Sequence, residues 1–313
     1  MEQEKIAYVF PGQGSQEVGM GLDVYVHYPS AREIFDQADK TVGFPLSRLC
    51  FEGPEEELTR TINVQPAVLV VSIAYLKAIQ EASGQKFPAP AFVAGHSLGE
   101  YTALVATGVL SLADGIRLVR ERGRLMHEAG RRKAGGMVAL MGMDQGVVEE
   151  ICLYTGTEIS NINSLGQIVI SGSDENLAKA RRLAQTKGAR RIVPLKVSGA
   201  FHSSLMEPAI PGLKEAIARF TFNSPLAPIV TNVTAEAVTE VEAIKEELVR
   251  QLRHCVQWQR SVENIIARGV TTFFEIGPGE VLTGLIRRIS PGVQTFNIGN
   301  LQSVNEIASW RAL

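Results

Sequence analysis

The chain has 313 residues, of which 45% are hydrophobic and 20% are charged. This composition is typical of a globular protein, and it excludes a disordered chain, a coiled coil and a collagen-like repeat. The 31 basic and 33 acidic residues leave a net charge of −2, so no overall positive field favours nucleic acid or a membrane surface.

Cysteine usage and apolar runs indicate the compartment. Cys50, Cys152 and Cys255 are an odd, scattered set, which argues against a disulfide framework and a zinc site and favours a reducing compartment. The N-terminus lacks a signal-peptide pattern, and the longest apolar stretch, 67–76, is too short to span a bilayer. We expect a cytoplasmic monomer that binds neither membrane nor nucleic acid and needs no metal or cofactor.

Short apolar runs that end in glycine-rich turns predict the strands of a parallel sheet. Residues 6–10 end at Pro11-Gly12, and residues 91–95 enter a glycine-rich turn with a helix-forming segment behind it. Strand, turn and helix in this order form the unit of a parallel α/β sheet. The predicted elements are strands at 6–10, 91–95 and 271–276 and helices at 64–80, 100–109, 114–128 and 281–288.

The middle of the chain predicts a different unit. Its order of β-α-β-β-α-β is the ferredoxin-like pattern. We therefore expect a large α/β-hydrolase-like domain with a mainly parallel sheet, formed by 1–131 and 198–313, and an inserted small ferredoxin-like βαββαβ domain at 132–197. The small unit's predicted elements are strands at 137–143, 157–163, 167–171 and 190–197 and helices at 145–154 and 174–188.

The motif Gly95-His96-Ser97-Leu98-Gly99 matches G-x-S-x-G, the nucleophile elbow. Its glycines allow a tight turn with Ser97 at the apex, and the N–H group of Leu98 at the helix start can stabilise an oxyanion. The alternative is a glycine-rich turn that merely contains a serine. The strand predicted before the motif and the helix predicted after it favour the elbow.

A serine nucleophile needs a base at neutral pH. Among the five histidines, His96 lies inside the elbow, where we assign it to supporting the turn. His202 follows the end of a predicted strand, which is a usual place for catalytic groups in α/β folds. The alternative is a loop histidine packed on Phe201.

The loop at residues 10–16 suggests a dinucleotide-binding turn, but the third glycine of that motif would fall at Glu17. We expect instead a turn that exposes backbone N–H groups and supplies a second oxyanion donor.

Arg122 differs from the other arginines of the helix predicted at 114–128. Its neighbours three and four residues away are all apolar, which places it on the inward face. A buried guanidinium needs an anionic partner. A structural pair with a core carboxylate and a clamp for a substrate carboxylate remain equally open.

Taken together, these motifs resemble the malonyl-CoA:acyl carrier protein transacylases over essentially the whole chain. The resemblance implies acyl transfer to the phosphopantetheine thiol of acyl carrier protein by a ping-pong mechanism, in fatty acid or polyketide synthesis. The matching segments are Phe10-Pro11-Gly12-Gln13-Gly14-Ser15-Gln16, Gln65-Pro66-Ala67, Gly95-His96-Ser97-Leu98-Gly99-Glu100-Tyr101, Arg122-Gly123, Asn161-Ile162-Asn163-Ser164, Ala200-Phe201-His202-Ser203, Val256-Gln257-Trp258 and Glu275-Ile276-Gly277-Pro278-Gly279.

The resemblance also implies a role for each site residue. Ser97 carries the acyl group, with His202 as its base, and the backbone N–H groups of Gln13 and Leu98 form the oxyanion hole. Arg122 holds the malonyl carboxylate. Further implied roles are the orientation of His202 by Gln257 and the restriction of branching at the acyl α-carbon by Phe201 with Leu98.

One departure from the family pattern is Cys255, which stands where proline is usual. Two other functions remain open: a thioester or acyl hydrolase with the same dyad, and a non-catalytic partner of a synthase. An inward Arg122 favours a charged acyl group, which argues against the hydrolase, and the intact set of site residues argues against the non-catalytic partner.

A basic face at 181–191 is a candidate docking surface for an acidic carrier, and the alternative is an ordinary solvated surface.

Overall fold

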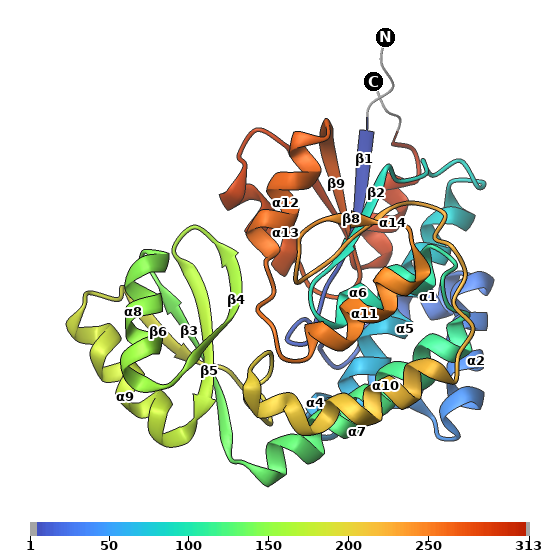
Figure 1. Ribbon diagram of the computed structural model, residues 1–313. Helices are drawn as coiled ribbons and strands as arrows, with labels where there is room; N and C mark the ends of the chain where they lie inside the picture. The colour runs from blue at the N-terminus through green and yellow to red at the C-terminus, as the bar shows by residue number, and fades with distance from the viewer. Residues whose placement is uncertain (1–4, 311–313) are drawn as a thin grey trace.

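The computed structural model describes residues 5–310, and within them two β-sheets organise the chain (Figure 1). The strands are β1 (Lys5–Phe10), β2 (Phe92–Gly95), β3 (Gly135–Met141), β4 (Glu158–Ser164), β5 (Gln167–Ser173), β6 (Arg191–Pro194), β7 (Ile229–Val230), β8 (Ala237–Val238), β9 (Val270–Ile276) and β10 (Gln294–Ile298). The larger sheet has the order β10-β9-β1-β2-β7-β8, and only the β7–β8 pair is antiparallel. The smaller sheet, β4-β5-β3-β6, is antiparallel throughout. The predicted α/β fold class is thereby confirmed.

Helices surround both sheets. The bounds are α1 (Leu22–His27), α2 (Pro29–Val42), α3 (Leu46–Glu52), α4 (Glu55–Thr59), α5 (Thr61–Ala82), α6 (Leu98–Ala106), α7 (Leu112–Arg132), α8 (Gln145–Thr155), α9 (Asp174–Thr186), the 3₁₀ turn η1 (Ser204–Ala209), α10 (Ile210–Ala218), α11 (Val241–Gln251), α12 (Trp258–Ala267), α13 (Val281–Ile289) and α14 (Leu301–Ile307).

Strand β1 lies in the middle of the larger sheet and is buried on both faces. Ile6, Tyr8 and Phe10 point into the main core, whereas Ala7 and Val9 point into a second core under α12 and α13. This alternation follows from the two-residue period of a strand. An apolar run without polar residues is expected for a parallel strand covered by helices on both sides.

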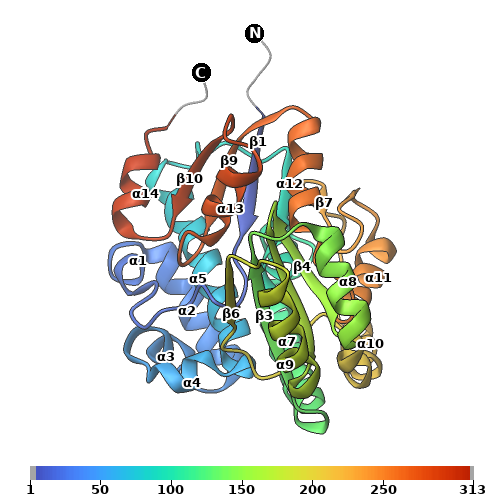
Figure 2. The ribbon, with the colours of Figure 1, turned by 90° about the vertical axis from the view of Figure 1, so that its left-hand side faces the viewer.

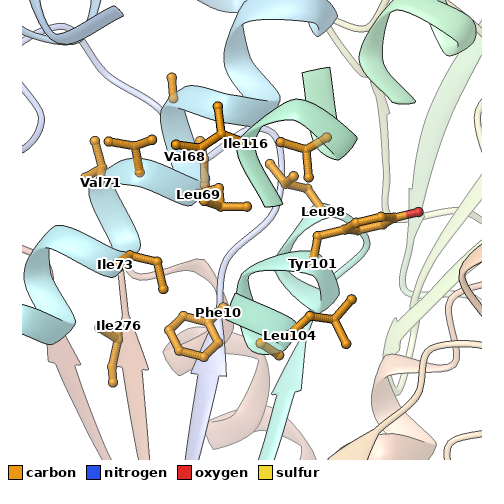
Figure 3. Close-up of a cluster of buried hydrophobic side chains, with 14 of the residues drawn as sticks. Phe10, Val68, Leu69, Val71, Ile73, Leu98, Tyr101, Leu104, Ile116 and Ile276 are labelled. Atoms are coloured by element: carbon orange, nitrogen blue, oxygen red, sulfur yellow. The ribbon is translucent and has the colours of Figure 1, made fainter. Parts of the chain in front are cut away.

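The main core is built around α5, which packs beside α6 and the sheet (Figure 3). Its 22 residues are long and apolar enough to cross a membrane, but 83% of the most apolar window is buried inside the protein. The apolar stretch is therefore part of a longer core helix than the sequence suggested. In Figure 3 the hydroxyl of Tyr101 points away from the apolar cluster.

The smaller sheet carries α8 and α9 on the face turned away from the rest of the molecule (Figures 1 and 2). Val138, Leu140 and Ile170 pack under these helices in a separate core. Met137 and Val169 belong instead to the main core. The sheet thus has two buried faces, one of which it shares with the larger part of the protein.

Most predicted elements occur within a few residues of their predicted positions. Helix α6, predicted at 100–109, begins earlier, directly after Ser97, because the turn before it is so tight. Ser111 caps α7, because its hydroxyl accepts from the N–H group of Asp114. The elements that were not predicted are the helices α1 to α4, the elements from η1 to α12, strand β10 and helix α14.

Candidate active site

The turn from β2 to α6 holds Ser97 in a backbone conformation that residues other than glycine rarely adopt. Its φ is 52° and its ψ is −102°, which costs on the order of 1–3 kcal/mol. A Cβ atom at Gly95 would lie 1.9 Å from the carbonyl carbon of Gly99, and one at Gly99 would lie 2.0 Å from the carbonyl oxygen of Phe10. Both glycines are therefore required for the turn to pack against β1.

His202 lies beside this serine. The Ser97 hydroxyl is 2.8 Å from Nε2 of His202, and Nδ1 is 2.7 Å from the carbonyl oxygen of Gln251. Because a carbonyl can only accept, Nδ1 carries the hydrogen and Nε2 is left to accept from the serine. Burial, and then the charge of Arg122, lower the pKa of His202 to about 3. The ring is therefore neutral at neutral pH, as a general base requires.

Arg122 comes from α7 and its side chain reaches the same serine. The residue is 1% exposed, and its Nη2 lies 3.2 Å from the Ser97 hydroxyl. Nη1 donates to Oε1 of Gln65, and Nη2 also donates to Oε1 of Gln251, each over 2.8 Å. Among residues 5–310 no carboxylate forms an ion pair with it. The guanidinium is thus held by neutral amides, which leaves its charge available to a ligand.

Two backbone N–H groups are candidates for an oxyanion hole. The loop after β1 touches the elbow, since a Cβ atom at Gly12 would lie 2.5 Å from the carbonyl oxygen of His96. The amide of Leu98 opens α6. Within the described part of the chain, neither the Gln13 nor the Leu98 amide donates a hydrogen bond.

A cleft of about 190 Å³ opens over these groups, between the two sheets. Ser97, Arg122 and His202 line it together with Gln13 and Phe201, a ring that is 5% exposed. Apolar side chains of β3, β5 and α13 complete the wall: Met137, Val169, Val281, Leu282 and Leu285.

The structure does not bring Gln257 to His202. Its N–H group donates to the carbonyl of Asn232, and the residue lines a separate hollow beside Cys255. The carbonyl oxygen of Gln251, rather than Gln257, accepts from Nδ1 of His202 and orients its ring. Cys255, at the usual proline position, lines that hollow and is not among the residues that line the cleft at Ser97 and His202.

Sequence reasoning missed Gln65, Asn232 and Gln251 as parts of the site. Asn232 accepts from the N–H group of Ser97 over 2.7 Å, and Gln251 is fully buried at the end of α11. A signal for Gln251 exists in the sequence, because it falls on the buried stripe that Ile244 and Leu248 begin. A polar residue on an apolar helix face indicates a partner in the interior.

His96 points away from the serine and supports the turn. Its Nε2 lies 2.8 Å from Oδ1 of Asn163 on β4, and its ring lies 5.6 Å from that of Trp258. This contact ties the elbow to the smaller sheet.

Within residues 5–310, no cluster of three or more His, Cys, Asp or Glu side chains is placed to hold a metal ion.

A serine paired with a buried neutral histidine beneath unengaged N–H groups defines an acyl-transfer site. The family model described as "Acyl transferase domain" matches residues 7–299, and the chain belongs to this family of acyltransferases. It is 44% identical to the malonyl CoA-acyl carrier protein transacylase of Bacillus subtilis over 305 residues. This alignment covers 96% of this chain and 95% of that relative. The predicted resemblance is thus confirmed.

Solved structures agree with this assignment. An acyl carrier protein S-malonyltransferase from Vibrio cholerae superposes with a TM-score of 0.92 at 38% identity, covering 97% of this chain and 100% of that one. A malonyl transacylase in complex with its type II polyketide synthase acyl carrier protein superposes with a TM-score of 0.94 at 39% identity, covering 97% and 99%.

Proposed function

We propose that this protein transfers a malonyl group from malonyl-CoA to the phosphopantetheine thiol of acyl carrier protein through a malonyl-Ser97 intermediate. The contact that carries the proposal is the 2.8 Å approach of the Ser97 hydroxyl to Nε2 of His202, beside the Arg122 guanidinium. The relatives' names supply the malonyl group and the carrier. A cytoplasmic location, a monomeric state and a small domain limited to 132–197 stay predictions.

In the first half-reaction, Nε2 of His202 takes the proton of Ser97 while Oγ attacks the thioester carbonyl. The N–H groups of Gln13 and Leu98 donate to the oxyanion that forms. The carbon–sulfur bond then breaks, and the protonated His202 returns its proton to the coenzyme A thiolate. In the second half, His202 deprotonates the carrier thiol, and its sulfur attacks the carbonyl of the acyl-serine. The bond between the acyl carbon and Oγ then breaks, and His202 returns the proton to Oγ.

Arg122 and Phe201 are proposed to select the acyl group. A carboxylate that accepts from Arg122 gains charge-assisted hydrogen bonds worth roughly 1.5–3 kcal/mol each. An acetyl group leaves the buried guanidinium without an anion and should react poorly. The Phe201 ring lines the cleft beside His202, where it would contact a methyl branch on the α-carbon.

The proposal is tested by intact mass after incubation with malonyl-CoA alone. We expect a malonyl adduct on the wild type and none on Ser97→Ala, whose transfer rate falls by several orders of magnitude. Ser204→Ala is the control, because Ser204 is exposed and bonds to Glu158 rather than to the dyad. An adduct that persists in Ser97→Ala contradicts the mechanism, and free malonate as the main product with carrier present indicates a hydrolase instead.

The malonyl assignment is tested by competition between malonyl-CoA and acetyl-CoA. Arg122→Ala should lose about a hundredfold or more in kcat/KM for malonyl-CoA, while its relative preference moves towards acetyl. Arg117→Ala is the control, since Arg117 lies on the same helix but is exposed and paired with Asp114. An unchanged order of preference in Arg122→Ala means that this arginine is purely structural.

A further inference from the structure

A buried carboxyl group, that of Glu100, lies beneath the nucleophile and has no part in the chemistry proposed above. Glu100 stands in the first turn of α6 and is 2% exposed. Its Oε2 accepts from Nε2 of Gln251 over 2.7 Å and from the backbone N–H group of Asn232 over 3.3 Å. One oxygen therefore joins two residues from different segments.

Both of these residues hold the backbone at Ser97. Nε2 of Gln251 also donates to the Ser97 carbonyl over 2.9 Å. The side chain of Asn232 accepts from the Ser97 N–H group over 2.7 Å and donates to the Gly95 carbonyl over 2.7 Å. The side chains of Asn232 and Gln251 thus hold the turn with positive φ at the nucleophile on both sides. Both residues bond to the same oxygen of Glu100, Gln251 through its Nε2 and Asn232 through its backbone N–H group.

The orientation of the Gln251 carboxamide also matters for Arg122. Oε1 of Gln251 accepts from Nη2 of Arg122. A carboxamide turned by 180° would set its NH₂ group against the guanidinium and its oxygen against the Ser97 carbonyl and Glu100, so that donors would face donors and acceptors would face acceptors. An acceptor at Glu100 therefore favours the orientation that binds Arg122.

We propose that Glu100 is a positioning residue: through Gln251 and Asn232 it fixes Ser97 and Arg122 relative to His202. The backbone of Gln251 completes this arrangement, because its carbonyl oxygen accepts from Nδ1 of His202. The proposal rests on the proposed function. Both groups that contact Oε2 are donors, so the role requires an acceptor oxygen there. Burial, and then the charge of Glu247, raise the pKa of Glu100.

The test compares two variants of similar volume. Glu100→Met removes the acceptor, so that the Asn232 N–H group loses its partner and Nε2 of Gln251 retains the Ser97 carbonyl. Glu100→Gln retains an acceptor oxygen. We expect Glu100→Met to slow Ser97 malonylation at saturating malonyl-CoA by about a hundredfold, the order expected when a reacting group moves by about 1 Å. Its preference for malonyl over acetyl should also fall. Glu100→Gln should stay close to the wild-type rate and preference.

A matched pair at Asp39 controls for stability. The Asp39 carboxylate accepts from the N–H group and hydroxyl of Ser47 over 2.8 and 2.5 Å, between α2 and α3. Asp39→Ala and Asp39→Asn should change the Tm but neither the malonylation rate nor the acyl preference. If Glu100→Met does not fold, Glu100→Asp, which withdraws the acceptor by one methylene, should lower the rate in folded protein.

The outcomes separate this inference from the proposed function. If the wild type never forms malonyl-Ser97, the proposed function fails. If the wild type is malonylated and Glu100→Met, or Glu100→Asp in its place, keeps the wild-type rate and preference, only the role of Glu100 is overturned. A Glu100→Gln variant as slow as Glu100→Met also contradicts the acceptor role.

Discussion

His202 and Arg122 are electrostatically linked, and the link determines how the base responds to pH. A histidine acts as a general base only while it is neutral, so activity falls as the pH drops through its pKa. Burial and the Arg122 charge lower the pKa of His202 to about 3. We therefore expect Ser97 acylation to persist well below pH 6.5, where an unperturbed histidine becomes protonated.

Removing the Arg122 charge should raise the pKa of His202, though not fully to its ordinary value, because burial is the larger cause. NMR titration of labelled histidine in wild type and Arg122→Met measures this shift. Arg117→Met is the control for charge removed elsewhere on α7, where the arginine is exposed. A His202 pKa that is the same in all three proteins would contradict the electrostatic link.

The same link gives the substrate a part in catalysis. A malonyl carboxylate on Arg122 would offset the charge that lowers the proton affinity of His202. His202 would then be a stronger base with a malonyl group in the cleft than with an acetyl group. Selection of the acyl group and activation of the nucleophile would thus both depend on Arg122.

Local sequence predicted the residues whose role is set by their own segment. The elbow around Ser97 is a strand, a turn and a helix in continuous sequence, and the inward face of Arg122 follows from its neighbours on one helix. The local sequence could not show whether Gln251 or Gln257 is the residue that contacts His202. Which of them meets His202 depends on where α11 ends in space, and spacing along the chain does not contain that information.

Helix α9, strand β6 and the residue before β6 present arginines that bear on the carrier protein. Arg181, Arg182, Arg190 and Arg191 are exposed, line one hollow, and form no ion pair among residues 5–310. Lys187, predicted on the same face, pairs with Glu150 over 2.8 Å. The four arginines are therefore free to meet the acidic carrier that the family resemblance implies.

Reversing two of these charges should weaken transfer to the carrier without slowing acylation by malonyl-CoA. For Arg190→Glu with Arg191→Glu we expect a KM for carrier roughly 5–30 times higher, given about 0.2–1 kcal/mol for each exposed pair and added repulsion. Its transfer should also depend less on salt. Arg48→Glu with Arg219→Glu is the control, with the same charge change on exposed arginines in α3 and directly after α10. If both double variants lose transfer to the carrier equally, the arginine hollow, lined by Arg181, Arg182, Arg190 and Arg191, is an ordinary solvated surface.

Hydrogen bonds and shared core residues join the two sheets of the molecule. The N–H group of Val256 donates to Ser160 on β4, and the Val256 carbonyl accepts from Ile162 on the same strand. His96 at the elbow bonds to Asn163. Because Met137 and Val169 pack in the main core, separating the smaller sheet would expose part of that core to water.

The smaller sheet should therefore unfold together with the rest of the protein, although its chain order is that of an independent domain. Calorimetry should show one transition for the wild type, with agreement between calorimetric and van't Hoff enthalpies. Leu140 is fully buried under α8 and α9, so Leu140→Ala should lower the free energy of unfolding by about 2–5 kcal/mol.

If the molecule unfolds cooperatively, this fall in the free energy of unfolding lowers the Tm of the single transition by roughly 3–8 °C. Leu248→Ala, in the main core, is the matched variant and should shift the same transition by a similar amount. An early separate transition in Leu140→Ala, with the main transition unmoved, would instead make residues 132–197 an autonomous folding unit. A single transition would show instead that the smaller sheet, which carries the arginine hollow, is stable only while it packs on the part of the chain that holds the catalytic cleft.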